Sequence, residues 1–211
     1  MKKKTTKKIY IGLVGEKGGG KDTVMKFVER LLPKKKIVQI RFSDILSDTL
    51  DIWGLARTRG NYQKLSPTMI DTYGKSALAN AVRARAEAAD ADIVFMNGVR
   101  WWADVTMIHA LRKKDAKSFI VYVTAPARVR YERLKKRGEK AGEKKATFKQ
   151  FMKEEKARTE IDIPRIGKKA DVVIGNTGTM DEFLNAVKAQ VLTLIGGKKH
   201  ESTQLFETKK Q

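Results

Sequence analysis

The feature that most constrains the fold of this chain is a run of glycines that directly follows an apolar segment. The stretch GEKGGGKDT, residues 15–23, follows the apolar residues 9–14. Behind it, apolar side chains recur at helical spacing from Val24 to Leu32. This order predicts a strand, a glycine loop and a helix. A further apolar run at 37–42 makes the segment a βαβ unit, which favours parallel strands with a right-handed crossover.

Three more apolar runs read as strands, and amphipathic segments separate them. The alternation predicts an α/β fold in which a central, mostly parallel sheet of five strands lies between two layers of helices. The further strands are expected at 92–96, 119–123 and 170–174, and helices at 45–55, 66–89, 105–111 and 183–194, with Ser66-Pro67 opening the second of these helices.

The charge of the chain limits the class of its partners. Its 211 residues carry 45 Lys and Arg against 24 Asp and Glu, a formal net charge of +21, so the surface should attract polyanions such as nucleotides or nucleic acid. No cysteine is present, and no apolar run is long enough to span a membrane. We expect a cytoplasmic protein with one domain at 9–195, a basic tail at 1–8 and a polar tail at 196–211.

The glycine loop has the residue types and the spacing that bind phosphate. Glycines let successive backbone N–H groups curl around phosphate oxygens, and the helix that follows presents its positive end to them. Lys21 then reaches the β- and γ-phosphates of a bound nucleotide. The predicted contacts come from Gly15, Gly18, Gly19, Gly20, Lys21, Asp22 and Thr23.

Asp22 departs from the usual pattern, in which Ser or Thr follows the lysine and gives a hydroxyl to Mg²⁺. An aspartate could hold the ion through water, and its charge suits the first turn of a helix. Thr23 still offers a hydroxyl one position later. We therefore expect Asp22 and Thr23 to form the metal site, and we expect a phosphotransferase rather than a switch-type GTPase.

Five segments carry a resemblance to a known family. These segments are GEKGGGKDT, RFSD, MNGVRW, ERLKKRG and ADVVIGNTGT. Together they resemble the nucleoside-monophosphate kinase branch of the P-loop kinases, especially deoxynucleoside monophosphate kinases and dephospho-coenzyme A kinases. The likeness spans about residues 9–194. It implies a three-layer P-loop NTPase fold, ATP and Mg²⁺ as cofactors, and a helical lid at about 128–165.

The resemblance implies an acceptor site at the ends of the second and third strands. Ser43 and Asp44 would contact the acceptor, although either could instead cap the helix that follows. Arg100 matches an arginine that grips the acceptor phosphate, and a guanidinium suits such a group. Asn97 stands where the family usually has an aspartate, which puts metal binding by this strand in question. Arg59, in a basic loop, is a further candidate.

The lid would supply positive charge to the transferring phosphoryl group. Arg133 and Arg137 lie one helical turn apart and resemble lid arginines that stabilise the charge of a loose transition state. A generic basic helix is the alternative. The lid is rich in Lys and Glu and has few apolar anchors, so we expect low local stability there. Asn176 follows the last strand, where the family places a loop that touches adenine.

The pattern as a whole predicts an enzyme. The resemblance implies that it transfers the γ-phosphoryl group of ATP to a small nucleotide, with a (deoxy)nucleoside monophosphate as the favoured acceptor and dephospho-coenzyme A as the alternative. Lys21, Arg100, Arg133 and Arg137 would form its catalytic set. A protein of another class, a nucleic-acid-binding P-loop NTPase, is the competing hypothesis. The basic charge supports it, but no recognisable nucleic-acid-binding motif does.

Overall fold

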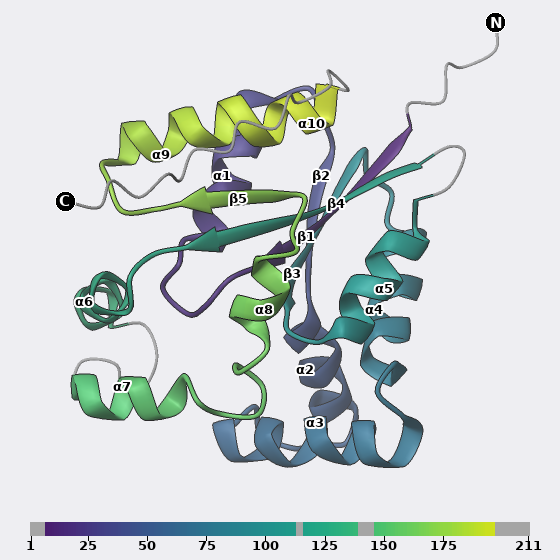
Figure 1. The fold of residues 1–211 in the computed structure, drawn as a ribbon. Coiled ribbons are helices and arrows are strands. Elements are labelled where there is room, and N and C mark those ends of the chain that lie inside the picture. The colour runs from purple at the N-terminus through teal and green to yellow at the C-terminus, as the bar shows by residue number, and fades with distance from the viewer. Residues whose placement is uncertain (1–6, 113–115, 139–145, 197–211) are drawn as a thin grey trace, which may run out of the picture.

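Five parallel strands form the centre of the molecule (Figure 1). The computed structural model describes residues 7–112, 116–138 and 146–196, except for the side chain of Arg59. The sheet order is β2-β3-β1-β4-β5, and all four neighbouring pairs are parallel. The α/β prediction is therefore confirmed. The strands are β1 (Lys8–Val14), β2 (Ile37–Arg41), β3 (Ile93–Val99), β4 (Ala116–Thr124) and β5 (Val172–Gly175).

Helices cover both faces of this sheet, which gives the expected three layers (Figure 1). The helices are α1 (Lys21–Leu31), α2 (Phe42–Ile52), α3 (Arg59–Tyr73), α4 (Ala77–Ala88), α5 (Trp102–Ala110), α6 (Ala127–Arg137), α7 (Phe148–Glu154), α8 (Ile163–Gly167), α9 (Met180–Val187), the π-helical turn η1 (Lys188–Leu192) and α10 (Thr193–Gly196). None of the helices in the described segments has both the length and the apolar character that a membrane span requires.

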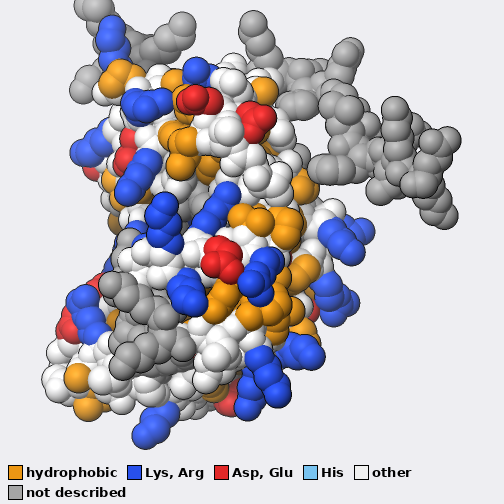
Figure 2. Space-filling view, turned by 90° about the vertical axis from the view of Figure 1, so that its left-hand side faces the viewer, with side chains coloured by type: hydrophobic (Ala, Val, Ile, Leu, Met, Phe, Trp, Pro, Cys, Tyr) orange, Lys and Arg blue, Asp and Glu red, His pale blue; other side chains and the backbone are white. Residues whose placement is uncertain are grey.

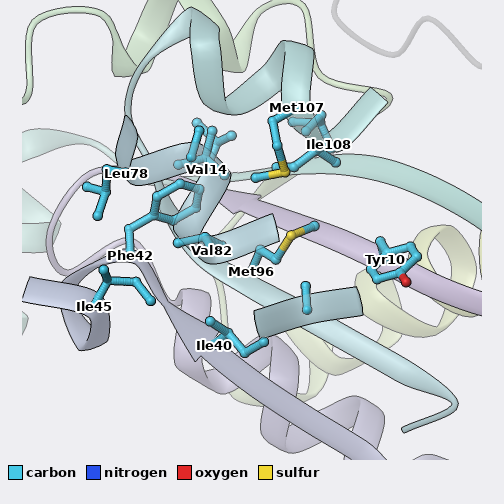
Figure 3. Packing of buried hydrophobic residues seen from close by; sticks show 14 of the residues in the cluster. Tyr10, Val14, Ile40, Phe42, Ile45, Leu78, Val82, Met96, Met107 and Ile108 are labelled. Carbon is cyan, nitrogen blue, oxygen red and sulfur yellow. The ribbon is translucent and has the colours of Figure 1, made fainter. Parts of the chain in front are cut away.

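The alternation of side chains along β1 divides the core in two. Ile9, Ile11 and Leu13 join α1 and α9 on one face of the sheet. On the other face, Tyr10 and Val14 pack with residues of α2, α4, α5 and α8, as Figure 3 shows for Phe42, Leu78 and Ile108. Both clusters use the central strand, so the glycine loop that follows β1 is anchored to both halves of the core.

The long helix predicted at 66–89 is wrong, because two helices occupy this region. α3 begins earlier, where the hydroxyl oxygen of Thr58 accepts a hydrogen bond from the N–H of Asn61 and caps the helix. Pro67 then lies inside α3 rather than in its first turn. Gly74 ends the helix with φ 88°, a backbone region that residues other than glycine rarely enter. α4 follows after a short turn.

The third strand extends past its predicted end at residue 96. Asn97 lies within β3, between Leu13 of β1 and Arg41 of β2, and it is 6% exposed. The residue that departs from the family pattern is thus a buried member of the sheet, next to the glycine loop.

At the start of β1, Lys8 belongs to the strand rather than to the tail, and its ammonium donates to three carbonyls at the end of α4.

The lid segment forms three short helices: α6, α7 and α8. The few apolar side chains there do anchor it locally, because Tyr131, Leu134 and Phe151 form a small buried cluster of their own. The rings of Phe148 and Phe151 both contact Tyr131 edge-on. Part of the lid, 139–145, and most of the tails predicted at 1–8 and 196–211, namely 1–6 and 197–211, lie outside the described residues.

Candidate phosphate-binding site

The glycine loop lies at the C-terminal end of β1, between β3 and β4. In open parallel sheets, ligands bind at this edge. Gly15 and Gly20 have φ values of 155° and 110°. A Cβ atom on Gly15 would lie 2.3 Å from the carbonyl oxygen of Val123, and one on Gly20 would lie 2.4 Å from Nδ2 of Asn176. Both positions therefore require glycine for space as well as for conformation.

The loop is fixed to β4 through Glu16. This carboxylate is 8% exposed and accepts hydrogen bonds from the hydroxyls of Tyr122, at 2.6 Å, and Thr124, at 3.3 Å. Burial and the bond to Glu16 raise the pKa of Tyr122 to about 12, so its hydroxyl keeps the proton that it donates. A loop tied to the sheet in this way is organised before any ligand binds.

The ammonium of Lys21 lies inside the loop. Its Nζ donates to the carbonyl oxygens of Gly15, at 2.5 Å, and Glu16, at 3.1 Å. Burial, together with a smaller effect of the positive charge of nearby Arg100, lowers the pKa of Lys21 to about 8. The backbone N–H groups of Lys21 and Asp22 lie in the first turn of α1, where no carbonyl of the same helix can accept a hydrogen bond from them. This combination of a cation and free amides fits a phosphate chain.

Asp22 is held by three donors from neighbouring strands. Its Oδ1 accepts hydrogen bonds from Asn97 Nδ2 at 2.8 Å, Gln39 Nε2 at 3.2 Å and Arg41 Nη2 at 3.5 Å. Burial raises the pKa of Asp22, but the bond from Gln39 and the charge of Arg41 outweigh it, so the net pKa lies below the usual value. Asp22 is therefore an anion near neutral pH.

No group of three or more His, Asp or Glu side chains in the described residues could hold a metal ion by itself. A magnesium ion bound with a nucleotide needs fewer protein ligands, because phosphates and water supply most of its oxygens. The carboxylate of Asp22 and the hydroxyl of Thr23, in the first turn of α1, have the oxygen chemistry that such an ion prefers. The residues present thus fit a nucleotide-bound Mg²⁺.

Arg100 lies at the end of β3, where the sequence predicted an anion-binding arginine. Asp104 fixes the backbone there, because its Oδ2 accepts the N–H groups of Arg100 and Trp101, each at 3.0 Å. Burial raises the pKa of Asp104 to about 6. The guanidinium itself pairs with Glu160, whose side chain is only 15% exposed. A carboxylate thus already occupies the anion-binding face of Arg100.

Arg130, which sequence reasoning missed, joins the lid to the loop. It is 5% exposed, donates to the carbonyl oxygen of Lys17 at 3.2 Å, and pairs with Glu155 of the lid at 2.6 Å. Lys17 in turn pairs with Glu154 at 2.6 Å and lies over the ring of Phe151. The spacing in the sequence could have indicated this arginine, since Arg130 is three residues before Arg133 and therefore on the same helix face.

The two lid arginines named from the sequence occupy different surroundings. Arg133 donates to Asn176 Oδ1 at 3.3 Å, and its buried Nη1 has no hydrogen-bond partner among the described residues. Arg137 is exposed at the last residue of α6. Asn176 also donates to the carbonyl oxygen of Gly19 at 2.9 Å. Its amide thus bridges the loop and α6 and is engaged at both ends.

The other acceptor candidates are less closely tied to the loop. Asp44 accepts the N–H of Arg41 at 2.8 Å, so the capping alternative is realised for this residue. Ser43 is exposed in the first turn of α2. Arg59 begins α3, but its side chain lies outside the described part.

On the side where α6 and α7 lie, Lys and Arg side chains outnumber acidic ones (Figure 2).

Solved structures with this fold include small-molecule kinases. Shikimate kinase from Acinetobacter baumannii, in complex with shikimate, superposes with a TM-score of 0.53 and 14% identity over 93% of this chain and 97% of that one. The APS kinase of Mycobacterium tuberculosis, in complex with AMPPNP and APS, gives 0.55 and 14% over 90% and 98%. The likeness shows that this chain has the P-loop kinase fold.

The sequence relatives come from archaea. No family model matches the sequence. A UPF0200 protein from Pyrococcus horikoshii is 27% identical over 189 residues, covering 89% of this chain and 98% of the relative. A UPF0200 protein from Sulfurisphaera tokodaii is 30% identical over 173 residues, covering 82% and 90%. Because the relative from Sulfurisphaera tokodaii reaches 30% identity and the similarity extends over most of both proteins, the chain belongs to the UPF0200 family.

Proposed function

We propose that this protein is an ATP- and Mg²⁺-dependent phosphotransferase whose acceptor is a small nucleotide, namely a (deoxy)nucleoside monophosphate. One observation carries the proposal: the Lys21 ammonium sits within a glycine loop that is already tied to β4, and the charge of Arg100 is close enough to lower the pKa of Lys21. A donor phosphate on the loop and an acceptor anion on Arg100 would therefore be neighbours.

In the proposed reaction, an oxygen of the acceptor phosphate attacks the γ-phosphorus of ATP. The bond from that phosphorus to the bridging oxygen breaks, ADP leaves, and the acceptor becomes a diphosphate. A monophosphate oxygen carries no proton near neutral pH, so this acceptor requires no general base. Positioning and fixed positive charge would supply most of the rate enhancement.

The proposed roles follow the surroundings of each residue. The loop glycines, Lys21 and Thr23 would hold the donor phosphates, and bound Mg²⁺ would neutralise developing charge, with Asp22 and Thr23 as its protein contacts. Arg100 would bind the acceptor after releasing Glu160. Arg133, whose buried Nη1 has no hydrogen-bond partner in the described part of the chain, would stabilise the transferring group, assisted by Arg137. Ser43, Asp44 and Arg59 are proposed for the remainder of the acceptor.

Dephospho-coenzyme A is the alternative acceptor. Its hydroxyl must lose a proton on phosphorylation, so this acceptor, unlike a monophosphate, would need a group that takes up the proton. The solved relatives of the fold with shikimate and with APS bound also hold small anionic molecules. An assay panel should therefore contain all nucleoside and deoxynucleoside monophosphates, dephospho-coenzyme A, shikimate and APS.

A coupled assay that detects ADP release with this panel tests the proposal. We expect turnover with at least one monophosphate and a loss of at least a hundredfold in kcat/KM for Lys21→Ala, because the cation that contacts the donor phosphates is removed. Lys26→Ala, on the exposed side of α1, is the matched control and should retain activity. Slow ATP hydrolysis without transfer to any acceptor would contradict the proposal.

A further inference from the structure

At positions 22 and 97, the residue types differ from those of common phosphate-binding loops. In common phosphate-binding loops, a Ser or Thr hydroxyl follows the lysine, and a carboxylate on a neighbouring strand completes the magnesium site. Here the carboxylate, Asp22, follows the lysine, and the strand residue Asn97 is an amide. The two are 75 residues apart in the chain yet form a direct hydrogen bond of 2.8 Å.

The amide is the group that this bond requires. Asn97 donates through Nδ2, whereas an aspartate at the same buried position would bring a second anion against Asp22. Two carboxylates in such contact cannot both ionise without a large penalty. The departures at positions 22 and 97 are therefore explained together, and neither needs to be regarded as a defect of the site.

The contacts of Asp22 also leave part of it available. The bonds from Asn97, Gln39 and Arg41 all reach Oδ1. The other oxygen, Oδ2, has no hydrogen bond among the described residues, and the Asp22 side chain is 54% exposed. The strands thus fix the orientation of the carboxylate through one oxygen and leave the second for a cation or its water.

We propose that Asn97 is a positioning residue for the metal. It orients Asp22 so that the loop, rather than the third strand, supplies the carboxylate that binds nucleotide-bound Mg²⁺. The inference rests on the proposed function, because it assumes a magnesium nucleotide on the loop. It adds a pairwise requirement: the carboxylate can be on either element, but only one of the two positions should carry it.

Calorimetric titration with ADP, with Mg²⁺ or with EDTA, measures the predicted coupling without any turnover. The coupling factor is the ratio of the Kd for ADP in EDTA to the Kd in Mg²⁺. We expect a factor of at least ten for the wild type. Asp22→Asn should reduce it to about one, and it should bind metal-free ADP more tightly than the wild type, because a repelling anion is removed.

The variants of Asn97 test its positioning role. Asn97→Ala should reduce the coupling factor at least threefold, since Asp22 loses its shortest donor. The double variant Asp22→Ser/Asn97→Asp places a hydroxyl after the lysine and moves the carboxylate to the third strand, and it should restore the factor to within about threefold of wild type. A purely structural role would weaken ADP binding equally in both buffers and would leave the factor unchanged.

Failure of this inference is separable from failure of the proposed function. An unchanged factor in Asp22→Asn, or a double variant that stays as low as Asp22→Asn, would overturn the inference even if the enzyme phosphorylates a monophosphate. Conversely, normal coupling in an enzyme without any acceptor would support the inference and overturn the kinase. If Asn97→Ala does not fold, the double variant Asp22→Ser/Asn97→Asp still tests the pairing of the two positions, and Asp22→Asn tests the metal contact.

Discussion

The burial of Lys21 determines the pH range in which its charge is available to bind phosphate. Its ammonium is enclosed by loop carbonyls, and burial, reinforced by Arg100, lowers its pKa to about 8. The free protein therefore loses this charge as the pH rises through about 8, whereas an ordinary lysine keeps it to above pH 10. A phosphate ligand prefers the charged form, so its binding should carry the same pH dependence.

We predict that the Kd for Mg·ADP rises about tenfold between pH 7 and pH 9, because roughly one molecule in ten still carries the Lys21 charge at pH 9. The sign follows from the linkage, since binding must take up the proton that the free protein has lost. Calorimetric titration across this pH range measures the effect.

Lys21→Arg is the matched control for this pH dependence. The guanidinium remains charged at pH 9, so the variant should bind more weakly overall but with a nearly flat profile. A wild-type Kd that does not change up to pH 9 would show that the Lys21 charge does not titrate in this range. Equal slopes in both proteins would assign the effect to another group.

The lid helices α6 and α7 pack around a small apolar cluster of their own, whereas α8 belongs to a main core through Ile163 and Ile166. Phe151 is 4% exposed and packs with Tyr131 and Leu134 in a cluster that is separate from the two main cores. Its contact with the loop runs through Lys17 and Arg130, which both lie over its ring. We therefore expect α6 and α7 to unfold locally before the sheet does.

We predict that Phe151→Ala removes about 3–5 kcal/mol from the local stability of the lid, the usual cost of deleting a buried phenyl ring, with little change in global unfolding. Hydrogen exchange followed by mass spectrometry should show loss of protection in peptides that cover 146–154. Phe183→Ala, which deletes a ring from the core beneath α9, is the control and should lower the global free energy of unfolding by a similar amount. The same global loss from both variants would contradict an independent lid.

Elements were predictable where the signal is local in the chain. The glycine loop, the five strands and the helix after the loop are specified by neighbouring residues, and the structure confirms them. The contact of Asn97 with Asp22 and that of Arg130 with Lys17 depend instead on the strand order, which brings together residues 75 and 113 positions apart. Periodicity contains no information on that order, so the partner of Arg130 in the loop and the reason for Asn97 could be found only in the structure.

At the scale of the whole molecule, the charge of +21 remains the main feature outside the loop. Basic side chains are spread over the side that carries α6 and α7 rather than gathered in one groove (Figure 2). Several of them are also paired, as Arg128 is with Glu132 and Lys17 with Glu154. A dispersed charge of this kind attracts polyanions at long range, but it does not build a sequence-reading surface.

We therefore predict weak, salt-sensitive binding of nucleic acid that is independent of the nucleotide site. The Kd for a single-stranded 20-nucleotide DNA, measured by fluorescence anisotropy, should rise about tenfold to a hundredfold between 50 and 200 mM salt, as expected for a few phosphate contacts. Saturating Mg·ADP should not displace the DNA. The double variant Lys136→Glu/Lys149→Glu, which changes exposed positions of α6 and α7, should weaken DNA binding while Mg·ADP binds as in the wild type. Binding that persists at 200 mM salt and competes with Mg·ADP would instead favour the nucleic-acid-binding NTPase, because the loop and the polyanion would then share one site.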